Sequence, residues 1–175
     1  MALLRRFSSA SLIITALVII IFSEMATAPF WPPADDMQSI IAALLISTYA
    51  SEDLVIKYPL LPWLAMMMLG WVFGRYLLAY REGRTKIGPV SLLLLLAVIT
   101  LLAFAAIRYN NGYGNMFLYR EDNSWQHWLH VSKYPPSAAF TFLELGILFL
   151  CLAVMIIIEN IIGVRKNGIL LVFGQ

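Results

Sequence analysis

Two histidines three residues apart offer the clearest opportunity for chemistry in this sequence. His127 and His130 lie in the segment 125–130, which reads WQHWLH, and on a helix they would share a face. Such a pair could bind a metal ion or act as a general base. Because we find no third metal ligand, we prefer a simpler interpretation, in which the segment is an amphipathic turn whose rings lie among lipid headgroups.

Three charged residues lie within or near long apolar stretches. These are Glu24, Arg75 and Glu144. A charge inside a membrane is costly, so it indicates either a function or a charge partner. Each also has a structural explanation: Glu24 could lie at the membrane surface, Arg75 could extend to the nearer surface, and Glu144 could lie only partway into the bilayer.

The segment 132–137, which reads SKYPPS, leads directly into an apolar stretch. Its two prolines favour an extended approach followed by a sharp helix start. Lys133 and Tyr134 are then placed at the membrane surface, where they could bind an anion or serve as an anchor.

The composition is that of a membrane protein. Of 175 residues, 61% are hydrophobic and 13% are charged, whereas soluble domains are about 45–50% apolar and about 25% charged. A net charge of +2 gives no indication of a nucleic-acid partner. A single cysteine, Cys151, rules out an intrachain disulfide. We find no zinc-ligand spacing, phosphate-binding glycine loop or serine-hydrolase motif.

Four stretches approach the roughly 20 apolar residues that a membrane-spanning helix needs. They cover residues 11–28, 60–80, 89–107 and 138–158. We therefore predict an all-α, polytopic transmembrane bundle forming one membrane domain over residues 1–175, in contact with the lipid bilayer. A shorter amphipathic pattern between Asp36 and Ala50 predicts an interfacial helix. Gly70 and Gly74 form a small-xxx-small step, which predicts close packing against another helix.

The distribution of basic residues predicts the orientation. Seven Lys and Arg residues fall on the side of the N-terminus and four on the other side, so we expect the N-terminus to be cytoplasmic. The long loops 29–59 and 108–137 then face outward, away from the cytoplasm. The first stretch has an alternative interpretation as a signal peptide, because Arg5 and Arg6 precede it and Ala26-Thr27-Ala28 follows its apolar part.

Several spaced motifs together resemble the heparan-α-glucosaminide N-acetyltransferase-like membrane proteins of bacteria. The matching positions are Tyr58, Pro59, Pro62 and Trp63, then Gly70 and Gly74, then Arg108, Asn110, Tyr113 and Gly114, then Ser132, Lys133, Tyr134, Pro135, Pro136 and Ser137, and finally Gly146. Leu171-Val172-Phe173-Gly174 resembles the start of a later helix, and residues before Tyr58 match only as a generic apolar helix.

The resemblance implies an acyltransferase that uses acetyl-CoA to acylate a sugar amine or hydroxyl. It also implies a catalytic histidine in an additional N-terminal region and further helices after residue 175, so we expect this chain to be a fragment that is inactive on its own. His127, His130 and Glu144 are the remaining catalytic candidates, and we expect no metal. The alternatives are a non-catalytic membrane subunit that binds a partner, and a small transporter that uses Arg75 and Glu144.

Overall fold

The computed structural model describes residues 6–162 and is mostly helical. Four helices are long and apolar enough to cross a membrane: α1 (Ser9–Thr27), α3 (Leu60–Arg81), α4 (Pro89–Asn110) and α6 (Ala138–Ile162). The predicted helical bundle with four spans is confirmed. In the most apolar part of each span only 17–33% of the residues are buried, so most of the helical surface is left for contact with lipid.

The helix starts follow the local sequence. Proline at the start of a helix costs little, because the first N–H groups have no partner within the helix. Pro59 immediately precedes α3, and Pro89 is the first residue of α4. Before α6, the Ser137 hydroxyl accepts a hydrogen bond from the backbone N–H of Phe140 at 2.9 Å. These three starts coincide with the predicted ones, whereas α4 and α6 continue three or four residues beyond their predicted ends.

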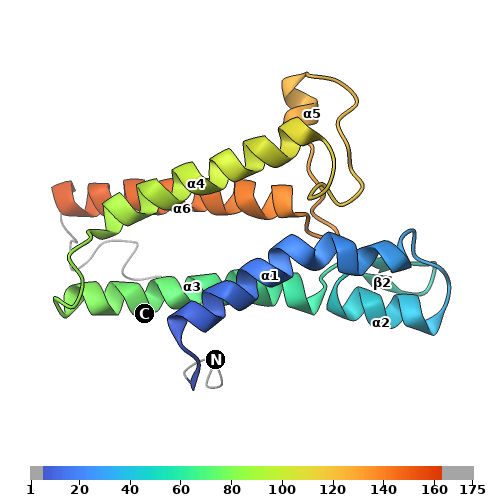
Figure 1. Cartoon of the computed structure of the whole chain (residues 1–175), viewed down its shortest axis with the longest axis horizontal. Coiled ribbons are helices and arrows are strands. Elements are labelled where there is room, and N and C mark those ends of the chain that lie inside the picture. The colour runs from blue at the N-terminus through green and yellow to red at the C-terminus, as the bar shows by residue number, and fades with distance from the viewer. Residues whose placement is uncertain (1–5, 163–175) are drawn as a thin grey trace.

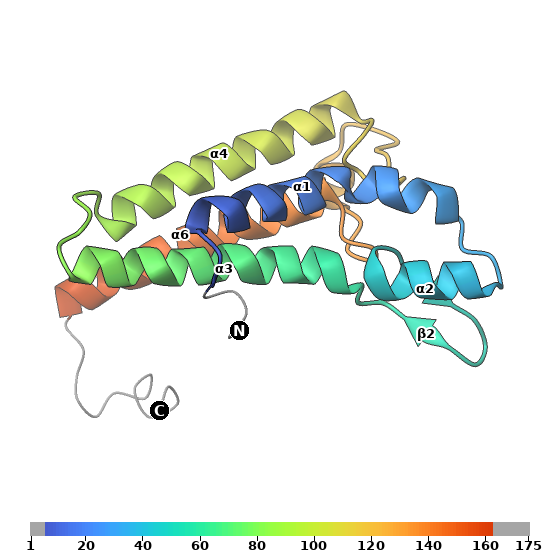
Figure 2. The same ribbon diagram turned by 60° about the horizontal axis from the view of Figure 1, so that its bottom comes forward.

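The spans pack as two pairs. Helix α4 lies along α6 and α1 lies along α3, while α1 and α6 touch more sparsely (Figures 1 and 2). The core between α1 and α3 is formed by Leu12, Ala16 and Ile20 from α1, Ala65 and Met68 from α3, and Ala138 at the start of α6. Helix α1 is thus part of the packed core, as its interpretation as a span requires.

Both long connections lie at the same end of the bundle. One holds the short 3-10 helix η2 (Ala28–Phe30), α2 (Met37–Leu45) and a hairpin of β1 (Tyr49–Ala50) and β2 (Val55–Ile56), in which Tyr49 pairs with Ile56. The other holds α5 (Trp125–Leu129). The turn between α3 and α4 lies at the opposite end (Figure 1). The two loops therefore share one face of the membrane domain, as the sequence predicted.

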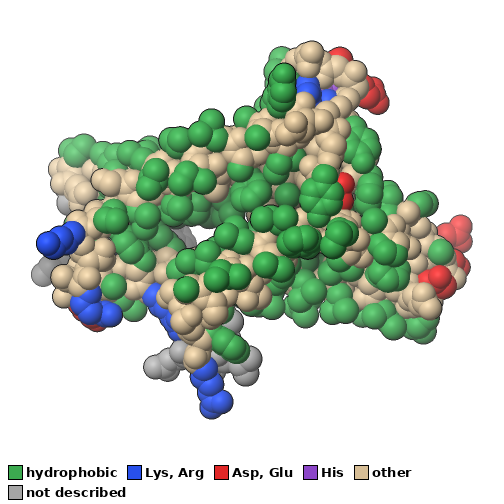
Figure 3. Space-filling view, in the orientation of Figure 1, with side chains coloured by type: hydrophobic (Ala, Val, Ile, Leu, Met, Phe, Trp, Pro, Cys, Tyr) green, Lys and Arg blue, Asp and Glu red, His purple; other side chains and the backbone are tan. Residues whose placement is uncertain are grey.

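The charged side chains are also divided between the two ends of the bundle. On the face shown in Figure 3, the acidic side chains gather at the end that carries the long loops, and most basic side chains gather at the other end. Helix α2 forms where a short amphipathic helix was predicted, and it exposes Ile41, Leu44 and Leu45. Its position at a membrane surface stays a prediction. The apolar segment near the C-terminus lies outside the described residues.

Candidate functional site

The loop 111–130 is organised around one buried guanidinium group. Arg108, at the C-terminal end of α4, is only 1% exposed. Its Nε donates to the carbonyl oxygen of Trp128 at 3.1 Å, and its Nη1 donates to Asn115 Oδ1 at 2.6 Å and to the Leu118 carbonyl at 3.1 Å. Its Nη2 donates to the carbonyl oxygens of His127 and His130. All five donors of the guanidinium are thus used by the protein itself.

This arrangement explains why α4 extends past its predicted end. The predicted span ends at residue 107, just before this charged side chain, and a charge in lipid is costly. The loop folds back over the side chain and supplies acceptors for all of its N–H groups, so the charge is buried in protein. Asn111 then ends the helix in a left-handed conformation, with φ of 49°.

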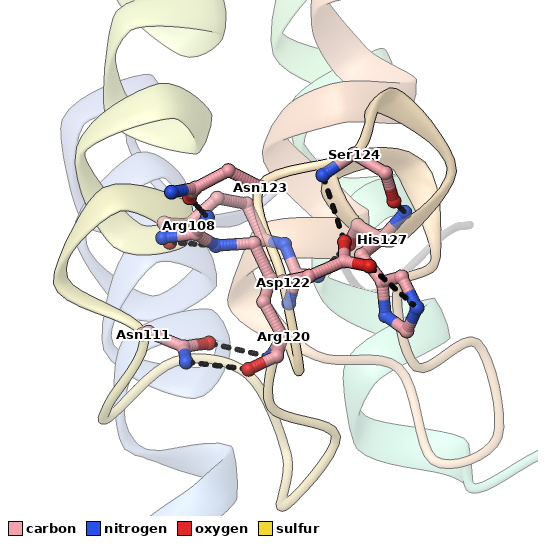
Figure 4. A network of polar contacts seen from close by, with 7 residues as sticks. All are labelled: Arg108, Asn111, Arg120, Asp122, Asn123, Ser124 and His127. Carbon is pink, nitrogen blue, oxygen red and sulfur yellow. Dashed lines mark hydrogen bonds and ion pairs between the residues drawn. The ribbon is translucent and has the colours of Figure 1, made fainter.

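A second arginine, Arg120, joins the loop to the end of α4 and to Trp128. The Nε of Arg120 donates to the carbonyl oxygen of Arg108 at 2.7 Å, and its guanidinium carbon lies 4.4 Å from the ring centroid of Trp128. Asn111 makes two hydrogen bonds with the backbone of Arg120, at 2.6 and 2.9 Å (Figure 4). The side chains of Arg120 and Asn123 are joined at 2.7 Å.

An Asp–His pair lies on this loop. His127 Nε2 is 3.9 Å from Asp122 Oδ2 (Figure 4), a distance that suits an ion pair when the imidazole is protonated. Hydrogen bonds from the Ser124 hydroxyl and backbone N–H hold the pKa of Asp122 below its ordinary value, so this carboxylate stays ionised. A carboxylate at this position can orient an imidazole and stabilise its protonated form.

The other histidine has a different environment. The side chain of His130 is exposed, and among the described residues it makes no side-chain hydrogen bond or ion pair. In the part of the chain that the structure describes, no group of three His, Cys, Asp or Glu side chains could hold a metal ion. The geometry therefore distinguishes the two histidines, which the sequence had treated alike. Beside the Asp–His pair lies a shallow depression of about 170 Å³, lined by Asn111, Arg120, Glu121, Asp122 and Asn123.

Glu24 fixes the same loop to α1. Its carboxylate is 5% exposed, and Oε2 accepts hydrogen bonds from the N–H groups of Gly114 at 2.5 Å and Met116 at 3.0 Å. Gly114 and Met116 have φ of 94° and 51°, a left-handed backbone that turns both N–H groups toward one acceptor. The structure gives Glu24 hydrogen-bond partners inside the protein, and its position at the membrane surface stays a prediction.

Further residues of the family motif support this connection. The Tyr113 hydroxyl donates to the carbonyl oxygen of Ile21 in α1 at 2.6 Å. The Asn110 side chain donates to the Ala106 carbonyl within its own helix, at 2.9 Å. The carbonyl of Gly114 accepts from the N–H of Ala139 at 2.9 Å, so the loop also contacts the first turn of α6.

The two proline motifs meet although they are 76 residues apart. The hydroxyl oxygens of Tyr58 and Tyr134 are 2.9 Å apart, and their rings pack edge to face with centroids 5.2 Å apart. The ring of Trp63 also packs against Tyr58, with ring centroids 5.6 Å apart. Lys133 Nζ lies 5.3 Å from the centroid of the Tyr134 ring.

The motif 132–137 itself is a tight turn. Two hydrogen bonds lie within it. The Ser137 N–H donates to the Ser132 carbonyl at 2.9 Å, and the Ser132 hydroxyl donates to the Pro135 carbonyl at 3.0 Å. Pro135, Pro136 and Ser137 are less than 2% exposed. In the other motif, Pro59 and Pro62 are also buried.

The glycine prediction needs correction. No heavy atom of the described residues lies within 4 Å of the position where a Cβ would stand on Gly70 or Gly74, so neither packs against a helix there. The close approach is made by Gly146 in α6, whose Cβ would lie 2.6 Å from Leu101 and 3.1 Å from Thr100 Oγ1 in α4. The small-xxx-small pattern led us to predict close packing at α3. The spacing of glycines along one helix does not indicate which face of that helix has a neighbour.

Gly70 instead lines an open groove between α3 and α6. The groove measures about 260 Å³, and its lining residues are Met66, Leu69, Gly70, Phe73, Glu144, Leu145, Leu148, Phe149 and Leu152. Arg75 lies elsewhere, with Nη1 donating to the Phe7 carbonyl at 2.7 Å. Both helices start at the same end, so the rise of about 1.5 Å per residue places Arg75 about 13 Å deeper than Glu144. The two residues are thus not in contact, and the polar pathway suggested for a transporter stays a prediction.

Sequence reasoning did not single out Arg120 and Asp122, which complete the loop network, whereas Asn115 was noticed only as the end of the motif 108–115. Their only signal was the density of polar residues in a long loop between two spans, where functional residues tend to lie. Asn115 is completely buried, with its side chain between Arg108 and the carbonyl of Gly112.

The fold and the site define a polytopic helical membrane protein whose two long loops form a polar cap at one end. The model of the family described as "Heparan-alpha-glucosaminide N-acetyltransferase, catalytic" matches residues 1–109, which is more than half of the chain. The chain therefore belongs to this family. No curated protein and no solved structure gives a significant match.

The family match extends to the N-terminal part of the chain. The first 57 residues lie inside the match, so the view that they resemble the family only as a generic helix is wrong. Glu24 and the motif 58–63 also fall inside it. The motif 132–137 and Gly146 lie beyond residue 109, and their assignment to the family stays a prediction. Both histidines also lie beyond the match.

Proposed function

We propose that the protein is a membrane-bound acyltransferase that moves an acetyl group from acetyl-CoA to an amine or hydroxyl group of a sugar. The family match over residues 1–109 is the observation that carries this proposal. We expected the chain alone to be inactive, because the resemblance implies a catalytic histidine in an additional N-terminal region. The match over residues 1–109 does not test this expectation, whereas the assay below does.

We further propose that His127 acts as the acid–base catalyst and that Asp122 orients it. The acceptor nitrogen or oxygen attacks the thioester carbonyl carbon, and a new C–N or C–O bond forms as the C–S bond breaks. The imidazole takes the proton lost by the acceptor and returns a proton to the leaving thiolate. The support is the 3.9 Å separation of the two side chains and the ionised state of Asp122 beside a solvent-open depression.

In this proposal Arg108 is a positioning residue. Its hydrogen bonds to the carbonyl oxygens of His127 and Trp128 hold the short helix α5, and therefore the imidazole, in place. We propose the inner membrane of a bacterium as the location, with a cytoplasmic N-terminus, because the N-terminal side carries more Lys and Arg than the loop side.

The experiment measures acetyl transfer from labelled acetyl-CoA to glucosamine-type acceptors by the purified chain in detergent, where both faces are accessible. Loss of general acid–base catalysis typically costs about 10²–10⁴-fold in rate, so His127→Gln should reduce kcat about 100-fold or more. Asp122→Asn should give a smaller loss, because only the orientation of the ring changes. His130→Gln is the matched control and should keep parental activity. Equal activity of His127→Gln and the parent would refute the assignment.

A second candidate function is a non-catalytic membrane subunit that binds a partner. One observation favours it. Arg108 and Arg120 both donate hydrogen bonds to carbonyl oxygens of the protein's own backbone, so few of their N–H groups remain to bind acetyl-CoA. The same assay separates the two candidates, because a subunit shows no transfer in the parent protein under any acceptor condition.

A further inference from the structure

The Tyr58–Tyr134 pair lies beside the starts of α3 and α6, on the side of the long loops, and the lining of the groove between these helices begins further along both of them. Tyr58 lies two residues before α3 and Tyr134 four residues before α6, and their hydroxyl groups join the two helix starts. From there both helices run in the same direction, away from the long loops (Figures 1 and 2). We propose that Lys57, Tyr58, Lys133 and Tyr134 bind the phosphate headgroup of an anionic phospholipid whose acyl chain lies in the α3–α6 groove.

The headgroup end offers positive charge and a free hydrogen-bond donor. In a pair of phenols, one hydroxyl donates to the other, so one O–H remains available for an outside acceptor. The hydrogen bond with Tyr58, followed by the nearby Lys133 and Lys57, lowers the pKa of Tyr134, whereas the same bond raises the pKa of Tyr58. Whichever hydroxyl donates within the pair, the other O–H can donate to a phosphate oxygen.

The helix starts add to this positive field. Helices α3 and α6 both begin here, and each contributes a partial positive charge of roughly half an elementary charge at its N-terminus. Helix α3 has no side-chain cap, so its first N–H groups are not bound by a capping side chain. Tyr58 is 64% exposed, and Lys57 and Lys133 are also exposed, so the site is accessible to a headgroup at the membrane surface.

The groove suits an acyl chain. With about 1.5 Å of rise per residue, it starts about 9 Å below the first residues of α3 and α6 and continues to about 20 Å, at Phe73 and Leu152. Its volume is about 260 Å³, and Gly70 deepens it by having no side chain. Among the lining residues only Glu144 is charged, and it lies at the upper end, nearest the headgroup. The deeper part is entirely apolar.

This combination favours a lipid over a helix from a second copy. A helix packed along the groove would leave the two lysines beside the helix starts without a counter-charge. A phospholipid matches the apolar groove and the basic helix starts at the same time, and both of its parts are present wherever the protein is in a membrane.

The test uses spin-labelled phosphatidylglycerol and spin-labelled phosphatidylcholine in phosphatidylcholine vesicles that contain the full chain. The fraction of motionally restricted label gives the relative affinity of the two lipids. A basic residue near an anionic surface contributes about 1 kcal/mol, which corresponds to roughly a fivefold preference per lysine. The parent should prefer phosphatidylglycerol, and both Lys133→Gln and Lys57→Gln should reduce the preference by roughly that factor.

Two further variants complete the experiment. Lys86→Gln is the matched control at the other end of the bundle and should keep the parental preference. Gly70→Phe should fill the groove and reduce the number of restricted lipids of both kinds. The proposal is overturned if the parent shows no preference, if Lys86→Gln loses as much preference as Lys133→Gln, or if Gly70→Phe changes the oligomeric state and leaves lipid binding unchanged. Transferase activity is not a readout, so failure here is separate from failure of the proposed function.

Discussion

Replacing Arg108 by methionine should destabilise the polar cap more than any other single loss of charge in it. Methionine keeps much of the buried stem but removes all five donors. The acceptors left behind are Asn115 Oδ1 and the carbonyl oxygens of Leu118, His127, Trp128 and His130. Because Arg108 is 1% exposed, water does not reach these acceptors unless the loop opens.

The magnitude follows from the number of bonds and their burial. A hydrogen bond to a charged group contributes about 1.5–3 kcal/mol, and a buried acceptor without a donor costs about 1–3 kcal/mol. The five bonds are not additive, and the loop can open to hydrate some carbonyls. We therefore expect the free energy of unfolding to fall by about 3–5 kcal/mol, at the upper end of single-mutant effects.

The assay is SDS-induced unfolding in mixed micelles, followed by circular dichroism, with limited proteolysis of residues 111–130 as a local readout. Arg84→Met is the matched control, because Arg84 is exposed and pairs only with Glu82 two residues away. An exposed ion pair contributes about 0–1 kcal/mol. A loss below about 1 kcal/mol in Arg108→Met, with unchanged proteolysis, would refute the conclusion that this side chain holds the loop.

Two further predictions concern topology and packing. Cysteine introduced at Asn123 into a variant without the native cysteine should react with an impermeant thiol reagent on intact cells, whereas cysteine at Gly83 should be protected, and the reverse pattern would invert the orientation. Gly146→Ala places a Cβ 2.6 Å from Leu101, and overpacking costs about 1–3 kcal/mol. At Gly70 an alanine has open space, and both variants gain about 1 kcal/mol of helix propensity. Thermal unfolding should therefore show that Gly146→Ala is less stable than Gly70→Ala. Equal stability of the two variants would contradict the close packing of Gly146 against α4.

The sequence determined the spans, because membrane insertion depends on local properties. A run of about 20 apolar residues must form a helix in lipid, whatever its neighbours are. The starts of α3, α4 and α6 could be predicted because proline and serine act on the first turn of the helix that follows them. The shared face of the two long loops followed from the number of spans between them.

The partners of the polar side chains depended on the tertiary structure. Glu24 binds the N–H groups of Gly114 and Met116, which are 90 and 92 residues away, through a left-handed turn that no residue spacing announces. The sequence also marked Gly70, but the close approach occurs at Gly146, because helix rotation decides which glycine has a neighbour. A spacing pattern records positions along one helix, whereas burial, charge pairing and the α3–α6 groove depend on how separate helices are placed against one another.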